Sequence, residues 1–315
     1  MPELVHLTVV RNEPEAEVLC GLLRSEGIEC EHRPTNFGVG TMTMAPVGIR
    51  CPEHSGRPQG VERVTKGVQR AAYEGVGAKV TRALIALNVL VYVAELAQGS
   101  GLNATKGSIY QNGALIANGI KRNDTLYGIP AHIPIPDLVG VAHGDWWRLI
   151  TAAFLHYGPF HIGLNMLALW WFGSALERRI GSGKFLAIYL VSGLAGSAGA
   201  LLLDPTTPTV GASGAIFGIL GAGLVLEQFH RDYVFGGSAL GLIVINLVFT
   251  FAVPNISIGG HVGGLAAGAV CTLGLSQFGR THVAYGRAGL VGWATIIGVG
   301  VVAVALSYYR VRGYA

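Results

Sequence analysis

Seven apolar segments, separated by mostly short polar loops, constrain this chain more than any other feature of its sequence. A helix needs about 20 apolar residues to cross the ~30 Å hydrocarbon core of a bilayer. Charged residues make up only 13% of the 315 residues, against about 25% in soluble proteins. We therefore expect an all-α polytopic membrane protein with helices at 82–98, 158–177, 184–203, 213–228, 237–254, 261–278 and 288–309.

The first 50 residues are more polar and predict a small soluble α+β module of βαβ type at 1–50. Residues 4–10 are rich in β-branched side chains and predict a strand, and 28–32 and 44–50 are two further candidate strands. Residues 14–25 carry an apolar stripe with helical spacing. We expect the basic stretch 51–79 to be a cytoplasmic linker and 99–157 to be a long first loop between apolar segments.

Basic residues in the short loops predict the orientation of the chain in the membrane. All of them fall on the side of the basic linker: Arg178, Arg179, Lys184, Arg231, Arg280 and Arg287. Because basic loops are retained in the cytoplasm, we expect a cytoplasmic N-terminus and, after seven spans, a C-terminus outside. Arg310 and Arg312 lie on the less favoured side, so the sequence leaves open whether 288–309 spans completely.

Two polar residues at the starts of apolar segments are candidates for chemistry. Ser213 opens the fourth segment between Gly211 and Gly214, where a serine can also be a helix cap or a small residue at a helix crossing. His261 opens the sixth segment. An ionisable residue in a span is costly and suggests function, although a structural histidine with satisfied hydrogen bonds is the alternative.

Small residues spaced by four accompany both candidates, at Gly214, Gly218 and Ala222 and at Gly260, Gly264 and Gly268. Residues four apart share a helix face, and two such stripes permit close approach of helices. Close approach would bring the Ser213 hydroxyl within hydrogen-bond reach of His261. A serine hydroxyl becomes a strong nucleophile when a base takes its proton, so the pair predicts acyl transfer.

The second apolar segment supplies candidate donors for an oxyanion. His161 and Asn165 are four residues apart and lie on one helix face. Together with the backbone N–H of Ser213 they could stabilise the negative charge that acyl transfer develops. The alternative for Asn165 is an interhelical hydrogen bond in the bundle.

These motifs together resemble the rhomboid intramembrane proteases over residues 80–280, the expected six-span catalytic core. Each occurs at the appropriate span and in the appropriate order, which makes the resemblance specific. The matching motifs are Trp147-Arg148, His161-x-x-x-Asn165, Glu177-Arg178-Arg179, Gly211-x-Ser213-Gly214 and His261-x-x-Gly264-x-x-x-Gly268.

The resemblance implies a bacterial serine endopeptidase with a Ser–His dyad, no acidic third member and no cofactor. Ser213 is then the nucleophile and His261 the general base and acid, and the oxyanion is bound by His161, Asn165 and the Ser213 amide. The resemblance also implies supporting roles for Gly211, Gly214, Phe217, Gly264, His156, Trp147 and Arg148. At Phe217 many relatives carry a tyrosine that stacks on the histidine, and a phenylalanine ring retains the stacking face.

The same resemblance implies single-span membrane proteins as substrates and the bacterial cell membrane as the location. A seventh span after a six-span core is a known variant, which 288–309 fits. The alternatives are a catalytically silent relative that binds membrane clients and a small-solute transporter or channel. The presence of both Ser213 and His261 disfavours the first, and the lack of an evident inverted repeat disfavours the second.

The four cysteines do not indicate a disulfide framework, and we expect reduced thiols and no metal. Cys51-Pro52-Glu53-His54 resembles the opening of a zinc module that some relatives carry before the first span. No Cys-x-x-Cys follows it, and structural zinc needs four ligands. A site built from Cys30, His32, Cys51 and His54 is the alternative that the sequence leaves open.

Overall fold

The structure is a computed structural model that forms two compact units, Met1–Gly75 and Val76–Ala315. It describes residues 5–10, 31–34, 47–51, 77–98, 105–131, 133, 135–253, 256–277, 283 and 289–314, together with six residues between 17 and 25. The expected linker 51–79 and the residues Cys30 and His54 lie largely or wholly outside the described residues.

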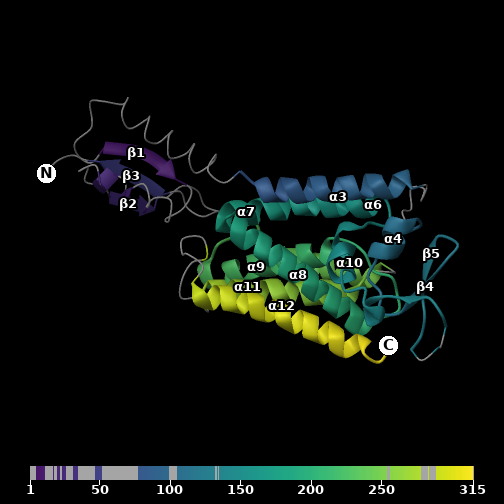
Figure 1. Cartoon of the computed structure of the whole chain (residues 1–315). Coiled ribbons are helices and arrows are strands. Elements are labelled where there is room, and N and C mark those ends of the chain that lie inside the picture. Colours follow the sequence, from purple (N-terminus) through teal and green to yellow (C-terminus); the bar gives the residue numbers. More distant parts are fainter. Residues whose placement is uncertain are drawn as a thin grey trace. The chain divides into compact units, whose positions relative to one another are not determined.

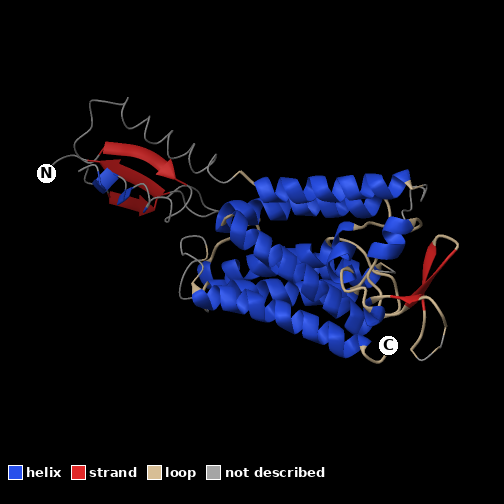
Figure 2. Cartoon of the chain, viewed as in Figure 1, coloured by secondary structure: helices blue, strands red, loops and turns tan. Residues whose placement is uncertain are grey.

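The first unit contains a three-stranded sheet of β1 (Val5–Val10), β2 (Glu31–Pro34) and β3 (Val47–Cys51). Its order is β1-β3-β2, and both outer strands pair antiparallel with β3 (Figure 2). The described residues between 17 and 25 are helical, and the side chains of Cys20 and Leu23 among them are buried. The expected α+β module is present, with the third strand inserted between the two strands that the helix connects.

Cys20 is disulfide-bonded, which corrects the expectation that the cysteines are reduced. Cys271, in the second unit, is a free and buried thiol. Among the described residues, no group of three or more His, Cys, Asp and Glu side chains is arranged to bind a metal ion.

A helix occupies each of the seven apolar segments in the second unit. The second segment is one continuous helix made of α6, a π-helical turn η3 and α7. Because a π-helical turn pairs residues five apart, the side chains of α7 point in other directions than an unbroken α-helix would give them. The elements are α3 (Lys79–Ala97), α6 (Pro159–Ala168), η3 (Leu169–Gly173), α7 (Ser174–Ile180), α8 (Ser182–Leu203), α9 (Ser213–His230), α10 (Ala239–Ala252), α11 (Ile258–Leu275) and α12 (Leu290–Val311).

Four of these helices, α3, α8, α11 and α12, are long and apolar enough to cross a membrane. With 22 residues, α12 has a length of roughly 33 Å, enough for a complete span. The apolar helix α10 is shorter, with 14 residues.

The centre of the unit is built from α8, α9 and α11, and α12 packs against α8 and α11 (Figure 1). Glycines allow the three central backbones to approach closely. A Cβ atom on Gly264 would collide with the carbonyl oxygen of Gly214, and one on Gly199 would collide with that of Gly259. The two predicted stripes on α9 and α11 therefore face each other, and α8 adds a third that the sequence analysis missed.

The first loop is folded rather than irregular. It contains a hairpin of β4 (Gly119–Arg122) and β5 (Thr125–Gly128), with β6 (Leu138–Val139) beside β4. Asn123 and Asp124 turn the hairpin with positive φ angles of 47° and 58°, as a two-residue hairpin turn of the primed type requires. The short helices are α4 (Ser108–Gly113), η1 (Val141–His143), α5 (Arg148–Thr151) and η2 (Ala152–Phe154).

Candidate active site

Ser213 and His261 meet at the centre of the second unit. Ser213 is the first residue of α9 and His261 lies in the first turn of α11. The Ser213 Oγ and the His261 Nε2 are 2.8 Å apart, a normal hydrogen-bond distance. Because the glycines hold α9 and α11 together just beyond these residues, the pair is positioned by backbone contact rather than by flexible side chains.

Two further side chains orient the imidazole of His261. The Phe217 ring, one turn along α9 from Ser213, stacks on it with centroids 4.1 Å apart and an interplanar angle of 17°. At the edge of the imidazole ring away from Ser213, the Thr250 Oγ1 of α10 lies 2.7 Å from the Nδ1 of His261. The histidine is largely buried, at 7% exposed. Each of its two ring nitrogens has a hydrogen-bond partner, Thr250 at Nδ1 and Ser213 at Nε2.

The tautomer of His161 makes it suitable as an oxyanion donor. The backbone N–H of Tyr157 donates to the Nδ1 of His161 at 3.3 Å, which leaves the proton of the neutral ring on Nε2. This Nε2 lies against Gly211, where a Cβ atom would be 2.8 Å from it. Gly211 has a φ of 127°, a conformation that favours glycine. The ring therefore approaches the backbone immediately before Ser213.

Asn165 lies beside this position, but its amide is partly engaged. Its Nδ2 donates to the carbonyl oxygen of His161 at 2.9 Å. An amide nitrogen carries two protons, so a second N–H is available to a ligand in the cavity. The first-turn backbone N–H groups of α9, including that of Ser213, have no intrahelical acceptor and add donors on the same side.

The Ser213 hydroxyl faces a cavity of about 660 Å³ that opens between α6 with η3 and α10. The wall is mainly apolar, and several rim residues are more than half exposed: Phe160, Leu164, Leu167, Trp171, Ile245 and Phe249. The loops 209–211 and 256–257 border it near Ser213 and His261. The cavity combines a polar centre with a broad apolar mouth.

Comparison with known proteins places the chain in a family. The Rhomboid domain family matches residues 143–278. The chain is 47% identical over 144 residues to rhomboid protease GluP of Bacillus subtilis (strain 168), and this match covers 44% of the chain and 28% of GluP. It is 38% identical over 154 residues to YdcA of the same organism, covering 45% of the chain and 77% of YdcA. The chain belongs to the rhomboid family.

The chain thus spans less than a third of GluP but most of YdcA. RHOMBOID-like protein 4 of Arabidopsis thaliana is 33% identical over 152 residues, which cover 46% of the chain and 38% of that relative. With its apolar helices, this rhomboid is an integral multi-pass membrane protein. The matched domain excludes the first unit, α3 and α12.

His156 packs against His161 beside the candidate site. Its side chain is fully buried, and its ring centroid lies 5.0 Å from that of His161. Burial, and then the proximity of His161, lower the pKa of His156 to about 3. His156 is therefore neutral at physiological pH and acts as a packing partner of His161.

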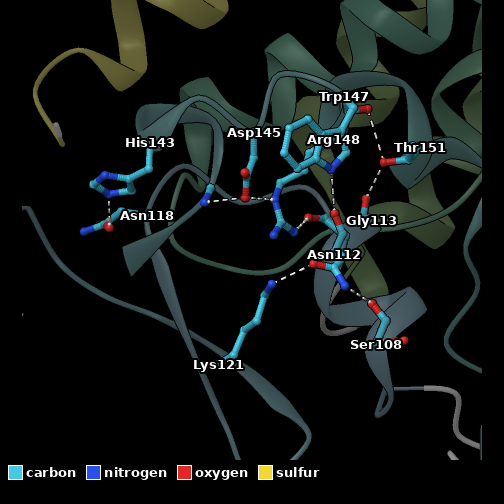
Figure 3. Close-up of polar contacts among 12 residues, drawn as sticks. Ser108, Asn112, Gly113, Asn118, Lys121, His143, Asp145, Trp147, Arg148 and Thr151 are labelled. Atoms are coloured by element: carbon cyan, nitrogen blue, oxygen red, sulfur yellow. Dashed lines mark hydrogen bonds and ion pairs between the residues drawn. The ribbon is translucent and has the colours of Figure 1, made fainter. Parts of the chain in front are cut away.

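Trp147 and Arg148 are not among the residues that line the cavity. Their hydrogen bonds hold the first loop together (Figure 3). The buried Arg148 guanidinium donates to the Asp145 carboxylate at 2.8 Å and to the Ala114 carbonyl oxygen at 2.7 Å. Burial lowers the pKa of Arg148, and the hydrogen bond and charge of Asp145 oppose that effect. The Trp147 indole N–H donates to the Asn112 carbonyl oxygen at 2.9 Å.

The structure thus brings Ser213, His261, His161, Asn165, Phe217, Gly211 and Gly214 together at one cavity. Gly264 packs against Gly214 and His156 packs against His161, outside the cavity lining. Thr250 was missed by the sequence analysis. A threonine in an apolar helix usually bonds to its own backbone, so its only sequence signal was polarity within a span.

Proposed function

We propose that this rhomboid is an active intramembrane serine protease that uses Ser213 and His261. The observation that carries the proposal is the 2.8 Å contact between the Ser213 Oγ and the His261 Nε2 at the wall of an open cavity. A nucleophile within hydrogen-bond reach of its base is the minimal arrangement for covalent acyl transfer.

In the first half-reaction, His261 accepts the hydroxyl proton as the Ser213 Oγ attacks the peptide carbonyl carbon. The N–H of Ser213, the His161 Nε2–H and the free N–H of Asn165 stabilise the oxyanion. The carbon–nitrogen bond then breaks, and His261 gives its proton to the leaving amine. Water attacks the acyl-enzyme with His261 again as base, which releases the acid and restores Ser213.

Single-span membrane proteins are the substrate class that the cavity favours. Its apolar mouth between α6 and α10 can accept a chain segment from the lipid, whereas its polar end can receive an unwound peptide. A peptide bond must leave its helix before attack, because helical carbonyl groups are hydrogen-bonded and enclosed. Helix-breaking residues in a substrate lower that cost.

A fluorophosphonate probe tests the mechanism without knowledge of the physiological substrate. We expect covalent labelling of the wild type and none of Ser213→Ala or His261→Ala, with parallel loss of cleavage of a model single-span substrate. Ser307→Ala is the matched control, because Ser307 is also buried but its hydroxyl donates to the carbonyl oxygen of Ala303 within α12. Cleavage by Ser213→Ala at the wild-type rate would refute the proposal.

A catalytically silent, client-binding rhomboid is the alternative outcome of this test. It predicts a correctly inserted wild type that captures the single-span substrate but neither reacts with the probe nor cleaves.

We further propose the bacterial plasma membrane as location, with a cytoplasmic module at 1–50, a linker at 51–79, the catalytic core at 80–280 and an added span at 288–309. Disulfides are rare in the cytoplasm, so the bond at Cys20 makes the orientation worth testing directly. A C-terminal alkaline phosphatase fusion should be active and a C-terminal green fluorescent protein fusion dark. The reverse result would contradict this orientation.

A further inference from the structure

A chain of two hydrogen bonds reaches His261 from α10. The Thr250 Oγ1 lies 2.7 Å from the His261 Nδ1, on the side of the ring away from Ser213. The same Oγ1 lies 2.7 Å from the backbone carbonyl oxygen of Asn246, one turn earlier in α10. Thr250 is 2% exposed, so water is largely excluded from these contacts.

The chemistry of the three groups fixes where the protons are. A carbonyl oxygen can only accept, and a threonine hydroxyl has a single proton. Thr250 must therefore donate to Asn246, because otherwise two lone pairs would face each other at 2.7 Å. Its oxygen is then an acceptor toward His261, which requires a proton on the Nδ1.

This assignment prepares the other ring nitrogen for catalysis. In the neutral imidazole a proton on Nδ1 leaves a lone pair on Nε2, and Nε2 is the atom that faces the Ser213 hydroxyl. The opposite tautomer would point an N–H at Ser213 and could not accept its proton.

We propose that Thr250 is a positioning residue that holds His261 in the tautomer able to deprotonate Ser213. The inference rests on the proposed protease function and adds a hydroxyl where other serine hydrolases place a carboxylate. In the step it supports, the Ser213 proton moves to Nε2, while the Nδ1–H stays bonded to the Thr250 oxygen. Thr250 neither gains nor loses a proton, and no charge is buried beside the imidazole before the reaction.

The position of α10 gives this contact a second consequence. Along most of α10 the side chains are exposed, and only Ala239, Ile243 and Thr250 are buried among its residues. Glu227 of α9 accepts hydrogen bonds from the backbone N–H of Ala239 and from the Ser238 hydroxyl, which fixes the first turn of α10. Thr250 ties the last turn of the same helix to the catalytic base.

Three variants separate positioning from packing. Thr250→Val keeps the shape of the side chain but removes the hydroxyl, and we expect kcat to fall by about 10- to 100-fold with KM within about twofold of wild type. Thr250→Ser restores the hydroxyl and should recover kcat to within about threefold. Thr272→Val is the matched control, because the buried Thr272 of α11 also bonds to a helical carbonyl oxygen, that of Gly268, and should leave kcat unchanged.

The tautomer itself can be measured without activity. Nitrogen-15 NMR of histidine-labelled protein in nanodiscs, with the His261 signals assigned by their loss in His261→Ala, should show a protonated Nδ1 and an unprotonated Nε2 in the wild type. Thr250→Val should show a mixture of tautomers, and Thr250→Ser the wild-type pattern.

Several results would overturn the inference: a wild-type ring protonated on Nε2, a Thr250→Val variant with wild-type kcat, or equal losses in Thr250→Val and Thr250→Ser. The Ser213→Ala variant keeps the two proposals distinct. Its full activity would refute the protease mechanism, whereas the tautomer of His261 would still be read directly from the NMR spectrum.

Discussion

Replacing Gly268 with alanine should force α9 and α11 apart and lower both stability and activity. An added Cβ atom would lie within 2.6 Å of three backbone atoms of Gly218, whereas an ordinary contact begins at 3.4 Å. Backbone atoms cannot rotate away as a side chain can. The contact with the Gly218 carbonyl oxygen must lengthen from 2.0 Å to at least 3.0 Å, so the two helices must separate locally by about 1 Å.

The expected magnitude combines two opposing effects. Overpacking of a tight interior costs about 1–3 kcal/mol, and this contact between rigid backbones belongs at the upper end of that range. Alanine recovers up to about 1 kcal/mol of helix propensity over glycine. We expect a net loss of about 2 kcal/mol in unfolding free energy, together with reduced cleavage because the Ser213–His261 contact spans the same two helices.

Equilibrium unfolding in mixed micelles measures the effect, and Gly298→Ala is the matched control. Gly298 is also in a helix, α12, but a Cβ atom there meets nothing within 4 Å. The same substitution should therefore be neutral or stabilising at Gly298. A Gly268→Ala variant as stable as the wild type, or equal destabilisation at both glycines, would refute the packing argument.

Three further outcomes follow from the site and its supports. Asn165→Ala should weaken cleavage without abolishing it, because other donors serve the oxyanion; a loss as complete as in Ser213→Ala would contradict this. Glu227→Ala should cost about 1 kcal/mol, as loss of a helix cap does, and hydrogen exchange should show faster opening at the Ala239 amide, which the carboxylate accepts in the wild type. Burial lowers the pKa of His156 to about 3 from its usual 6.5. Between pH 6.5 and about pH 3, the unfolded chain therefore binds a proton at His156 that the folded chain does not bind. His156 therefore makes stability fall as pH drops from 6.5 toward 3, by at most about 1.4 kcal/mol per pH unit, and the wild type should show a steeper decline than His156→Gln in pH-dependent unfolding.

Hydropathy predicted the helices of the second unit because a bilayer leaves the backbone few alternatives. Every spanning backbone group must be bonded within the chain, so a long apolar segment has to be helical. The π-helical turn at Leu169–Gly173 has no such signature, since it depends on how one side of the rod packs.

The first loop was less predictable. Its turn is made by Asn123 and Asp124 without glycine, so the strongest hairpin signal was absent. Arg148 could be singled out from the sequence, but its carbonyl partner at Ala114 could not, because the contact joins residues 34 positions apart.

At the candidate site, residue chemistry singled out Ser213 and His261, whose side chains the structure brings within 2.8 Å, and small-residue spacing predicted the close approach of their helices. Thr250 was not identifiable, because its role depends on where one hydroxyl lies relative to a ring from another helix. The disulfide at Cys20 was likewise not predicted, since few cysteines with irregular spacing carry little pairing information.

The exposed apolar rim of the cavity determines which measure of substrate concentration governs the rate of the proposed reaction. The exposed rim residues of the cavity belong to α6, η3 and α10 and are apolar. Under the proposed protease function, a membrane-embedded substrate therefore reaches Ser213 by lateral diffusion among lipids. The quantity that saturates the site is then the number of substrate molecules per lipid, not their number per litre. Adding lipid at constant protein and substrate amounts should slow cleavage by surface dilution, although every aqueous concentration stays the same.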